Sequence, residues 1–162
     1  MDVDWKTWTP TVRATLLFVE RGEELLLIRK KTGLGAGKIN APGGKIEPGE
    51  TPEQGAVREV LEEVGVRAHG VRRVGELSFQ FVDGLRLHAV VFVASGHTGE
   101  PHSTREADPL WVRRDAIPYD EMWADDRYWV PHLLAGEGFH LRAVFDDDEM
   151  LSHTLEVWSL DA

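Results

Sequence analysis

Residues 51–64 have the apolar periodicity of an amphipathic helix. Their apolar side chains recur three and four positions apart and therefore lie on one side of it: Ala56, Val57, Val60, Leu61 and Val64. Thr51 is the expected N-cap, with Pro52 at the first helical position, and Gln54 completes a Thr-x-x-Gln capping box. Gly65 ends the predicted helix.

Most other apolar residues are concentrated in short runs that are typical of β-strands. The predicted strands cover residues 12–19, 24–29, 71–82, 85–94, 110–112, 139–145 and 151–158. A second, short helix is expected to begin at Asp125 or Asp126 and to run through Leu134, with limits that Pro131 leaves open. Strands on both sides of one central helix predict an α/β sandwich.

Two segments show neither the helical pattern nor the strand pattern of apolar residues. Residues 1–10 contain Trp5, Trp8 and Pro10, and they predict either a short strand or an arm packed by its tryptophans. Residues 30–38 form a glycine-rich, flexible loop that can cradle phosphate, although it lacks the Lys-Ser/Thr ending of a P-loop.

Length and composition narrow the class of protein. A chain of 162 residues with 42% hydrophobic and 28% charged residues is typical of one soluble globular domain, here residues 1–162. The absence of cysteine excludes disulfides, thiol catalysis and cysteine-ligated zinc. The apolar runs are shorter than the ~20 residues of a membrane span, and Asp2, Asp4 and Lys6 argue against a signal peptide. We expect a cytoplasmic monomer.

The net charge of −10 disfavours a protein that grips long nucleic acid through its phosphates. It remains compatible with a nucleotide substrate if metal ions neutralise the contact. Such ions have an evident place on the predicted helix, where Glu59, Glu62 and Glu63 lie together away from the apolar side. Arg58 can offset part of their repulsion through Glu62. Mg²⁺ or Mn²⁺ would offset more, because both prefer oxygen ligands; the alternative is an ordinary solvated face.

The spacing of this segment favours the metal site. Residues 44–66, GKIEPGETPEQGAVREVLEEVGV, resemble without a gap the signature of the Nudix hydrolases. That resemblance implies the Nudix fold, an α/β/α sandwich around a central mixed sheet, and metal-dependent cleavage of a phosphoanhydride.

The resemblance continues outside the signature. Residues 30–40, 121–129 and 139–140 are similar to the mammalian-type MutT homologues, a branch of the Nudix hydrolases. These enzymes hydrolyse oxidised purine nucleoside triphosphates such as 8-oxo-dGTP to the monophosphate and pyrophosphate, and so cleanse the nucleotide pool. The alternatives are a broad-specificity (d)NTP, dinucleoside polyphosphate or nucleotide-sugar pyrophosphatase, and a non-catalytic binding module.

The resemblance also implies a set of site residues. The metal would be held by Glu59, Glu62, Glu63, Glu106 and the Gly44 carbonyl. Glu59 is the expected general base, with Glu106 as the second choice. Arg58 would orient the glutamates, Glu50 would support the loop, and Lys45 would reach an outer phosphate oxygen.

The base pocket that the resemblance implies is aromatic and acidic. Its expected lining residues are Thr15, Lys30, Asn40, Phe79, Trp123, Asp125, Asp126, Trp129 and Phe145. The aromatic rings offer faces for a purine, and a protonated member of the aspartate pair could donate as well as accept. The competing interpretations are plain core aromatics and a helix cap at the aspartates. Leu34, Ile39 and Leu87 stand where the family has bulkier or aromatic residues, which predicts a broader range of nucleotides.

Overall fold

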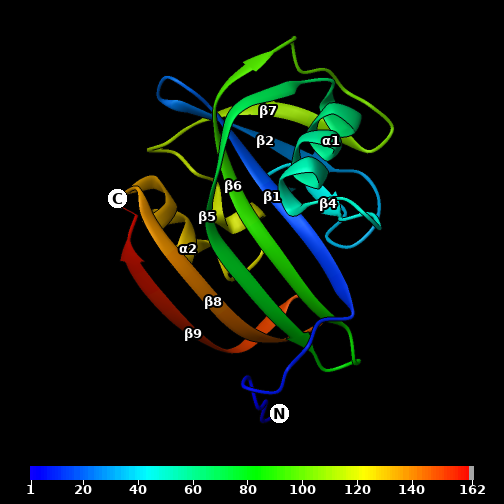
Figure 1. The fold of residues 1–162 in the computed structure, drawn as a ribbon, viewed down its shortest axis with the longest axis vertical. Helices are drawn as coiled ribbons and strands as arrows, with labels where there is room; N and C mark the ends of the chain where they lie inside the picture. Colours follow the sequence, from blue (N-terminus) through cyan, green and yellow to red (C-terminus); the bar gives the residue numbers. More distant parts are fainter. Residues whose placement is uncertain (161–162) are drawn as a thin grey trace.

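The computed structural model describes residues 1–160 as two α-helices and a 3-10 turn around one mixed sheet (Figure 1). The elements are β1 (Val12–Arg21), β2 (Glu24–Lys30), β3 (Ile39–Asn40), β4 (Gly43–Lys45), α1 (Pro52–Val64), β5 (Arg67–Phe81), β6 (Arg86–Thr98), β7 (Ala107–Arg113), the 3-10 turn Tyr119–Glu121, α2 (Asp126–Leu134), β8 (Glu137–Asp146) and β9 (Glu149–Ser159).

The sheet has the strand order β3-β2-β1-β6-β5-β8-β9, with β4 added to β1 and β7 to β2. The β1–β6 and β5–β8 pairs are parallel and the others are antiparallel. In β1, Phe18 packs into the core shared with α2, whereas Leu17 and Val19 pack into the core shared with α1. Because successive residues of a strand point to opposite faces, the two helices cover opposite sides of the sheet (Figure 1). The α/β/α prediction is confirmed.

The ends of α1 form as the sequence predicts. The Thr51 hydroxyl accepts a hydrogen bond of 3.1 Å from the Gln54 backbone, and the Gln54 side chain accepts one of 2.9 Å from the Thr51 backbone. Gly65 ends the helix at φ 77°, a left-handed conformation that glycine adopts without steric cost.

Several predicted limits were wrong. β5 begins four residues before Val71, and β6 continues to Thr98, because each pairs with the other well beyond its apolar run. The short strands β3 and β4 were missed, since their length leaves no period to detect. Pro131 lies inside α2.

The N-terminal segment is an arm, in which Trp5 and Trp8 pack with ring centroids 5.3 Å apart. Within residues 1–160, neither helix is long and apolar enough to cross a membrane.

Candidate active site

The acidic part of the site is built where β4 meets α1. Gly44 pairs with Thr15 of β1, so the glycine-rich turn is fixed to the sheet directly beside the helix. A Cβ at Gly44 would collide with the Glu59 carboxylate, and one at Gly43 would collide with the backbone of Thr15. Gly43 therefore requires glycine, because β4 and β1 approach too closely for any side chain there, whereas a side chain at Gly44 would displace the Glu59 carboxylate.

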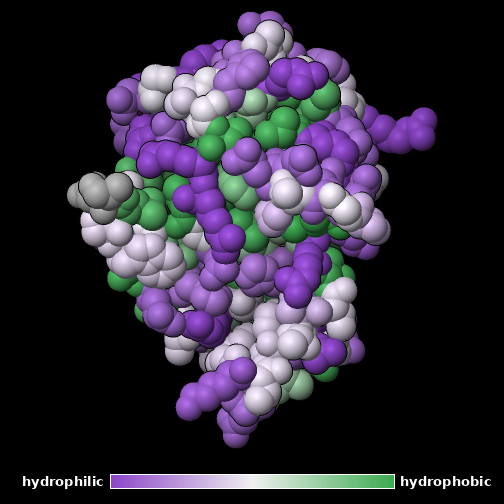
Figure 2. Space-filling view, viewed as in Figure 1, coloured by the Kyte–Doolittle hydropathy of each residue, from purple (hydrophilic) through white to green (hydrophobic). Residues whose placement is uncertain are grey.

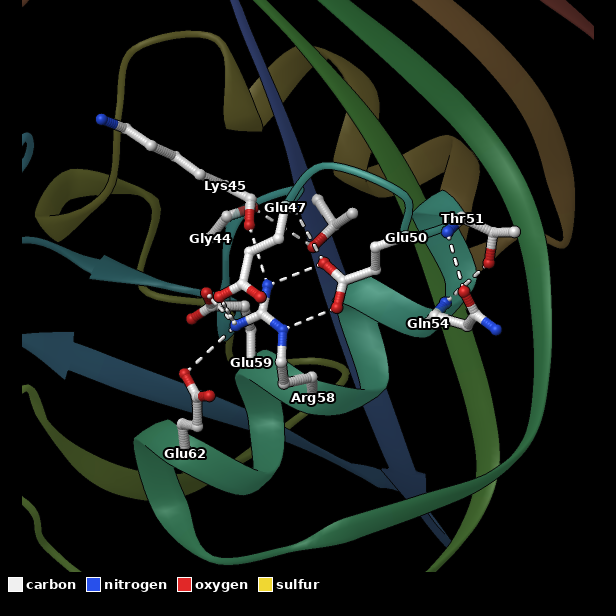
Figure 3. A network of polar contacts seen from close by, with 10 residues as sticks. Gly44, Lys45, Glu47, Glu50, Thr51, Gln54, Arg58, Glu59 and Glu62 are labelled. Carbon is white, nitrogen blue, oxygen red and sulfur yellow. Dashed lines mark hydrogen bonds and ion pairs between the residues drawn. The ribbon is translucent and has the colours of Figure 1, made fainter.

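Arg58 is the centre of the polar network around this turn (Figure 3). Its guanidinium makes two hydrogen bonds to Glu50, at 2.7 and 2.8 Å, one of 2.9 Å to Glu59 and one of 3.2 Å to Glu62. It also donates to the Lys45 carbonyl at 3.0 Å, whereas the Lys45 amine extends away from the carboxylates in Figure 3. These bonds lower the pKa of Glu50 to about 2 and raise the pKa of Arg58. The predicted Arg58–Glu62 contact forms, and Glu50 supports the loop.

Glu63 has a different environment from the other helix glutamates. It is buried rather than solvent-facing, with 3% exposure, and its Oε1 accepts a hydrogen bond of 2.9 Å from the Gly43 backbone. Burial raises the pKa of Glu63 to about 7, with smaller contributions of the same sign from Glu59 and Glu106. Burial also raises the pKa of Glu59. The exposed Glu106 therefore lies close enough to both helix carboxylates to affect their protonation.

These residues have the chemistry of a site for a hard divalent cation. In the described part of the chain no three acidic or histidine side chains already converge as ligands. Arg58 and Gly43 each hold part of these carboxylates. One oxygen of each remains without a hydrogen bond within residues 1–160: Oε2 of Glu59, Oε1 of Glu62 and Oε2 of Glu63. Oxygen-only donors with unmet negative charge are what Mg²⁺ and Mn²⁺ prefer.

Thr104, which the sequence did not single out, connects this cluster to Glu106. Its hydroxyl donates to the Glu63 carbonyl at 2.6 Å and accepts from the Glu106 backbone at 3.2 Å. Lys31 then donates to the Glu106 carbonyl from its backbone at 2.9 Å. The loop before β7 is thereby attached to the end of α1 by contacts between residues far apart in sequence.

A cavity of about 430 Å³ lies on the α2 side of the sheet, next to the glycine-rich turn. The structure brings these sequence-predicted residues to its wall: Thr15, Lys30, Asn40, Lys45, Phe79, Trp123, Asp125, Asp126 and Phe145. Phe81, which was missed, also lines it and stacks on Phe145 with centroids 5.6 Å apart. Its position two residues after Phe79 in a strand could have indicated this.

Trp129 is not among the lining residues. It is completely buried, stacks on Phe139 at 5.1 Å and donates from Nε1 to Oδ2 of Asp125 at 2.7 Å. Asp125 occupies the N-cap position of α2 but makes no capping hydrogen bond. The cap interpretation was therefore wrong, because the carboxylate is held by Trp129 instead.

The neighbouring Asp126 is the least satisfied group of the cavity. Both aspartates are buried, at 2% and 3% exposure, and Oδ2 of Asp126 has no hydrogen-bond partner within the described residues. Burial raises the pKa of Asp125 to about 6; burial and then the Asp125 charge raise the pKa of Asp126 further above its usual range. Burial and mutual repulsion therefore both oppose ionisation of the two carboxyl groups together, and a protonated member would place a donor beside an acceptor.

Residues 8–133 match the model of the NUDIX domain. The chain belongs to the NUDIX family. It is 41% identical over 143 residues to the oxidized purine nucleoside triphosphate hydrolase of Mus musculus, covering 87% of this chain and 92% of that protein. It is 42% identical over 126 residues to the enzyme of the same name from Danio rerio, covering 77% and 81%.

Solved structures agree with this assignment. A MutT protein from Bacillus halodurans is 28% identical and superposes with a TM-score of 0.81 over 90% of this chain and 97% of that one. The protein is therefore a Nudix hydrolase, and the predicted family is confirmed. Nudix hydrolases depend on a divalent metal ion.

Proposed function

We propose that this Nudix hydrolase converts nucleoside triphosphates with an oxidised purine, such as 8-oxo-dGTP, to the monophosphate and pyrophosphate. The observation that carries the proposal is the buried Asp125–Asp126 pair with its unpartnered Oδ2. Oxidation at C8 converts the N7 acceptor of guanine into an N–H donor and adds a carbonyl at C8. A carboxyl pair that shares one proton can meet both a donor and an acceptor, whereas an ionised pair can only accept.

Other groups of the cavity support recognition of a purine. Asn40 uses its Oδ1 to accept from the Ala41 backbone at 2.9 Å, which leaves its amide N–H₂ to donate to a base edge. Trp123 packs edge to face against Phe145, with centroids 5.6 Å apart, so its ring is held firmly at the cavity wall. The names of the mouse and zebrafish relatives point to the same substrate class.

The phosphate chain would extend from this cavity towards the glycine-rich turn. Glu59, Glu62, Glu63, Glu106 and the Gly44 carbonyl would hold Mg²⁺, with Mn²⁺ as a substitute. The ion would supply charge neutralisation at the phosphates and a lower pKa for the attacking water. Glu59 is the proposed general base and Glu106 the second candidate. Arg58 fixes the directions of the Glu59 and Glu62 carboxylates, and Lys45 is the proposed contact for an outer phosphate.

Leu34 and Leu87 favour a second candidate, a nucleotide pyrophosphatase of broader specificity. Both line the cavity, and Leu34 is 49% exposed at its rim. Aliphatic side chains bury a base without the stacking geometry of an aromatic ring, so they discriminate less between bases.

A substrate panel distinguishes the two. We expect kcat/KM for 8-oxo-dGTP to exceed that for dGTP by about tenfold or more, which corresponds to ~1.4 kcal/mol of transition-state binding. Equal kcat/KM values for 8-oxo-dGTP, dGTP, dATP and UTP would favour the pyrophosphatase of broader specificity. Faster turnover of a dinucleoside polyphosphate would contradict both candidate functions. Binding without release of pyrophosphate would identify a non-catalytic module. We propose that the protein is a monomer, and analytical ultracentrifugation measures this.

A further inference from the structure

The sheet face that carries α1 is apolar beneath the helix and becomes polar further along its strands. In β6, Val90, Phe92 and Ala94 pack beneath α1, whereas His88, two residues before Val90, belongs to a polar region that no helix covers (Figure 1). In Figure 2, hydrophilic and intermediate side chains, in purple and white, cover the lower part of this face, where the N-terminal segment runs in Figure 1. An apolar sheet face needs cover, but a polar one can border a cavity.

A cavity of about 240 Å³ lies between this polar face and the N-terminal arm, and it shares no lining residue with the first cavity. β1 shows why: Val12 and Ala14 line the first cavity, while Arg13 between them lines the second. The two cavities are therefore on opposite faces of the sheet.

Two tryptophans of the arm form the outer wall. Trp5 and Trp8 are half-buried and line the cavity, and their rings are tilted at 55° to each other. Trp8 is fixed by a hydrogen bond of 3.0 Å from its Nε1 to Oε1 of Gln80 on β5. The cavity thus has an indole wall attached to the sheet by a defined contact.

The carboxylate on the sheet side of the cavity, that of Glu76, is already held by an arginine and two histidine side chains. Glu76 lies 3.5 Å from Nε2 of His88 and 3.3 Å from Nδ1 of His140, and it also pairs with Arg73. His140 in turn contacts the Ser78 hydroxyl through Nε2 at 2.9 Å. This Ser–His–Glu chain is not equipped for acyl transfer, because β5 is paired on both sides and its backbone N–H groups are used in the ladders rather than as an oxyanion hole.

Arg13 is the cationic group of the cavity that remains unpaired. Its guanidinium makes no hydrogen bond or ion pair within residues 1–160, whereas Arg142 on the same wall pairs with Glu156. A planar guanidinium without a counter-ion binds carboxylate or phosphate oxygens in a bidentate manner. The chain as a whole carries a net charge of −10, but this unpaired guanidinium beside two indoles makes the cavity locally favourable for an anionic ligand.

We propose that this second cavity binds a small planar aromatic anion, with its ring against the indoles of Trp5 and Trp8 and its anionic group on Arg13. Ring stacking and the charged pair act together, so neither an uncharged ring nor a bare anion meets both halves of the site. Carboxylate and phosphate present the same pair of oxygens to Arg13. The site is independent of the triphosphate chemistry on the other face.

The indole N–H resonances of the 162-residue chain, assigned with Trp5→Phe and Trp8→Phe, provide a site-specific test. We expect phenyl phosphate, at concentrations up to roughly 10 mM, to shift the Trp5 and Trp8 resonances saturably. Phenol and inorganic phosphate should each bind about tenfold more weakly or worse, since each lacks one half of the interaction. The Trp123 resonance reports separately on the first cavity.

Two variants complete the test. Arg13→Gln should weaken phenyl phosphate binding at Trp5 and Trp8 by about tenfold or more. Arg72→Gln is the matched control, because Arg72 is also an exposed arginine of the sheet without an ion pair in the described residues, and it lies outside the cavity. Unmoved Trp5 and Trp8 resonances, equal binding of phenol or phosphate, or unchanged binding by Arg13→Gln would each overturn the proposal. A benzoate titration shows whether carboxylate replaces phosphate.

Discussion

Trp129 donates a hydrogen bond of 2.7 Å to Oδ2 of Asp125, although the two side chains lie on different sides of the cavity wall. The tryptophan is completely buried and the carboxylate faces the cavity. The contact therefore couples the packing of α2 to the position of the group proposed to read the base.

Trp129→Phe should keep most of the ring packing and remove this donor. Leaving a buried carboxyl oxygen unsatisfied costs about 1–3 kcal/mol, and we expect the free energy of unfolding to fall by that amount. KM for 8-oxo-dGTP should rise because Asp125 loses its fixed orientation. Urea denaturation and steady-state kinetics measure the two effects. Trp158→Phe is the control, since Trp158 is 43% exposed, and an equal loss there would contradict the explanation.

The stability of the protein should depend on pH through the aspartate pair. Burial raises the pKa of Asp125 to about 6 and that of Asp126 well above its ordinary value. The folded state then retains protons that the unfolded chain releases above about pH 4, so the free energy of unfolding falls as pH rises through 6, by at most ~1.4 kcal/mol per pH unit for each proton. Glu63, with its pKa raised to about 7, contributes with the same sign.

Asp126→Asn removes one of these titrating groups, so the free energy of unfolding should fall less steeply as the pH rises. Urea denaturation at about pH 5, 6 and 7 compares the slopes of the two proteins. Parallel slopes would show that Asp126 is ionised in the folded state, and the proton-sharing pair would then have to be abandoned.

Glu62→Gln and Glu63→Gln should each lower kcat by ~10³-fold, equivalent to about 4 kcal/mol, because a neutral amide is a poor ligand for a hard cation. Folding should survive in both, since a glutamine carbonyl can still accept the Gly43 hydrogen bond. Glu53→Gln, on the exposed first turn of the same helix, should be neutral. Near-normal turnover in both active-site variants would contradict the proposed metal site. Calorimetry with Mn²⁺ measures metal binding directly.

Arg58→Lys tests orientation rather than charge. Lysine keeps the positive charge but cannot reproduce the two parallel bonds to Glu50 together with those to Glu59 and Glu62. We expect a fall of about 10–100-fold in kcat, as for other residues that orient metal ligands, with a higher Mg²⁺ requirement. Unchanged Mg²⁺ dependence would mean that Arg58 supports the loop alone.

Thr104→Val removes the hydroxyl that joins the Glu63 carbonyl to the Glu106 backbone. The shape of the side chain is retained, so a roughly tenfold lower kcat with unchanged KM is expected from the displaced Glu106. Thr9→Val, at an exposed threonine of the N-terminal arm, provides the comparison. If both variants turn over alike, the Thr104 bridge has no part in catalysis.

Local features of this protein are readable from the sequence because their partners are a few residues apart. The Thr51–Gln54 capping box, the Gly65 stop and the Arg58–Glu62 contact all form as predicted, since a helix fixes the distance between such positions. The family signature likewise lies within one uninterrupted segment.

The tertiary structure decided what the sequence left open. Glu63 is buried because β4 folds back onto α1, and Trp129 lies behind the cavity while Phe81 lines it, because the register of β5 and the packing of α2 determine which faces meet. The unpartnered oxygen of Asp126 arises in the same way. Helix periodicity fixes which side a residue takes, but the element that packs against that side comes from distant parts of the chain.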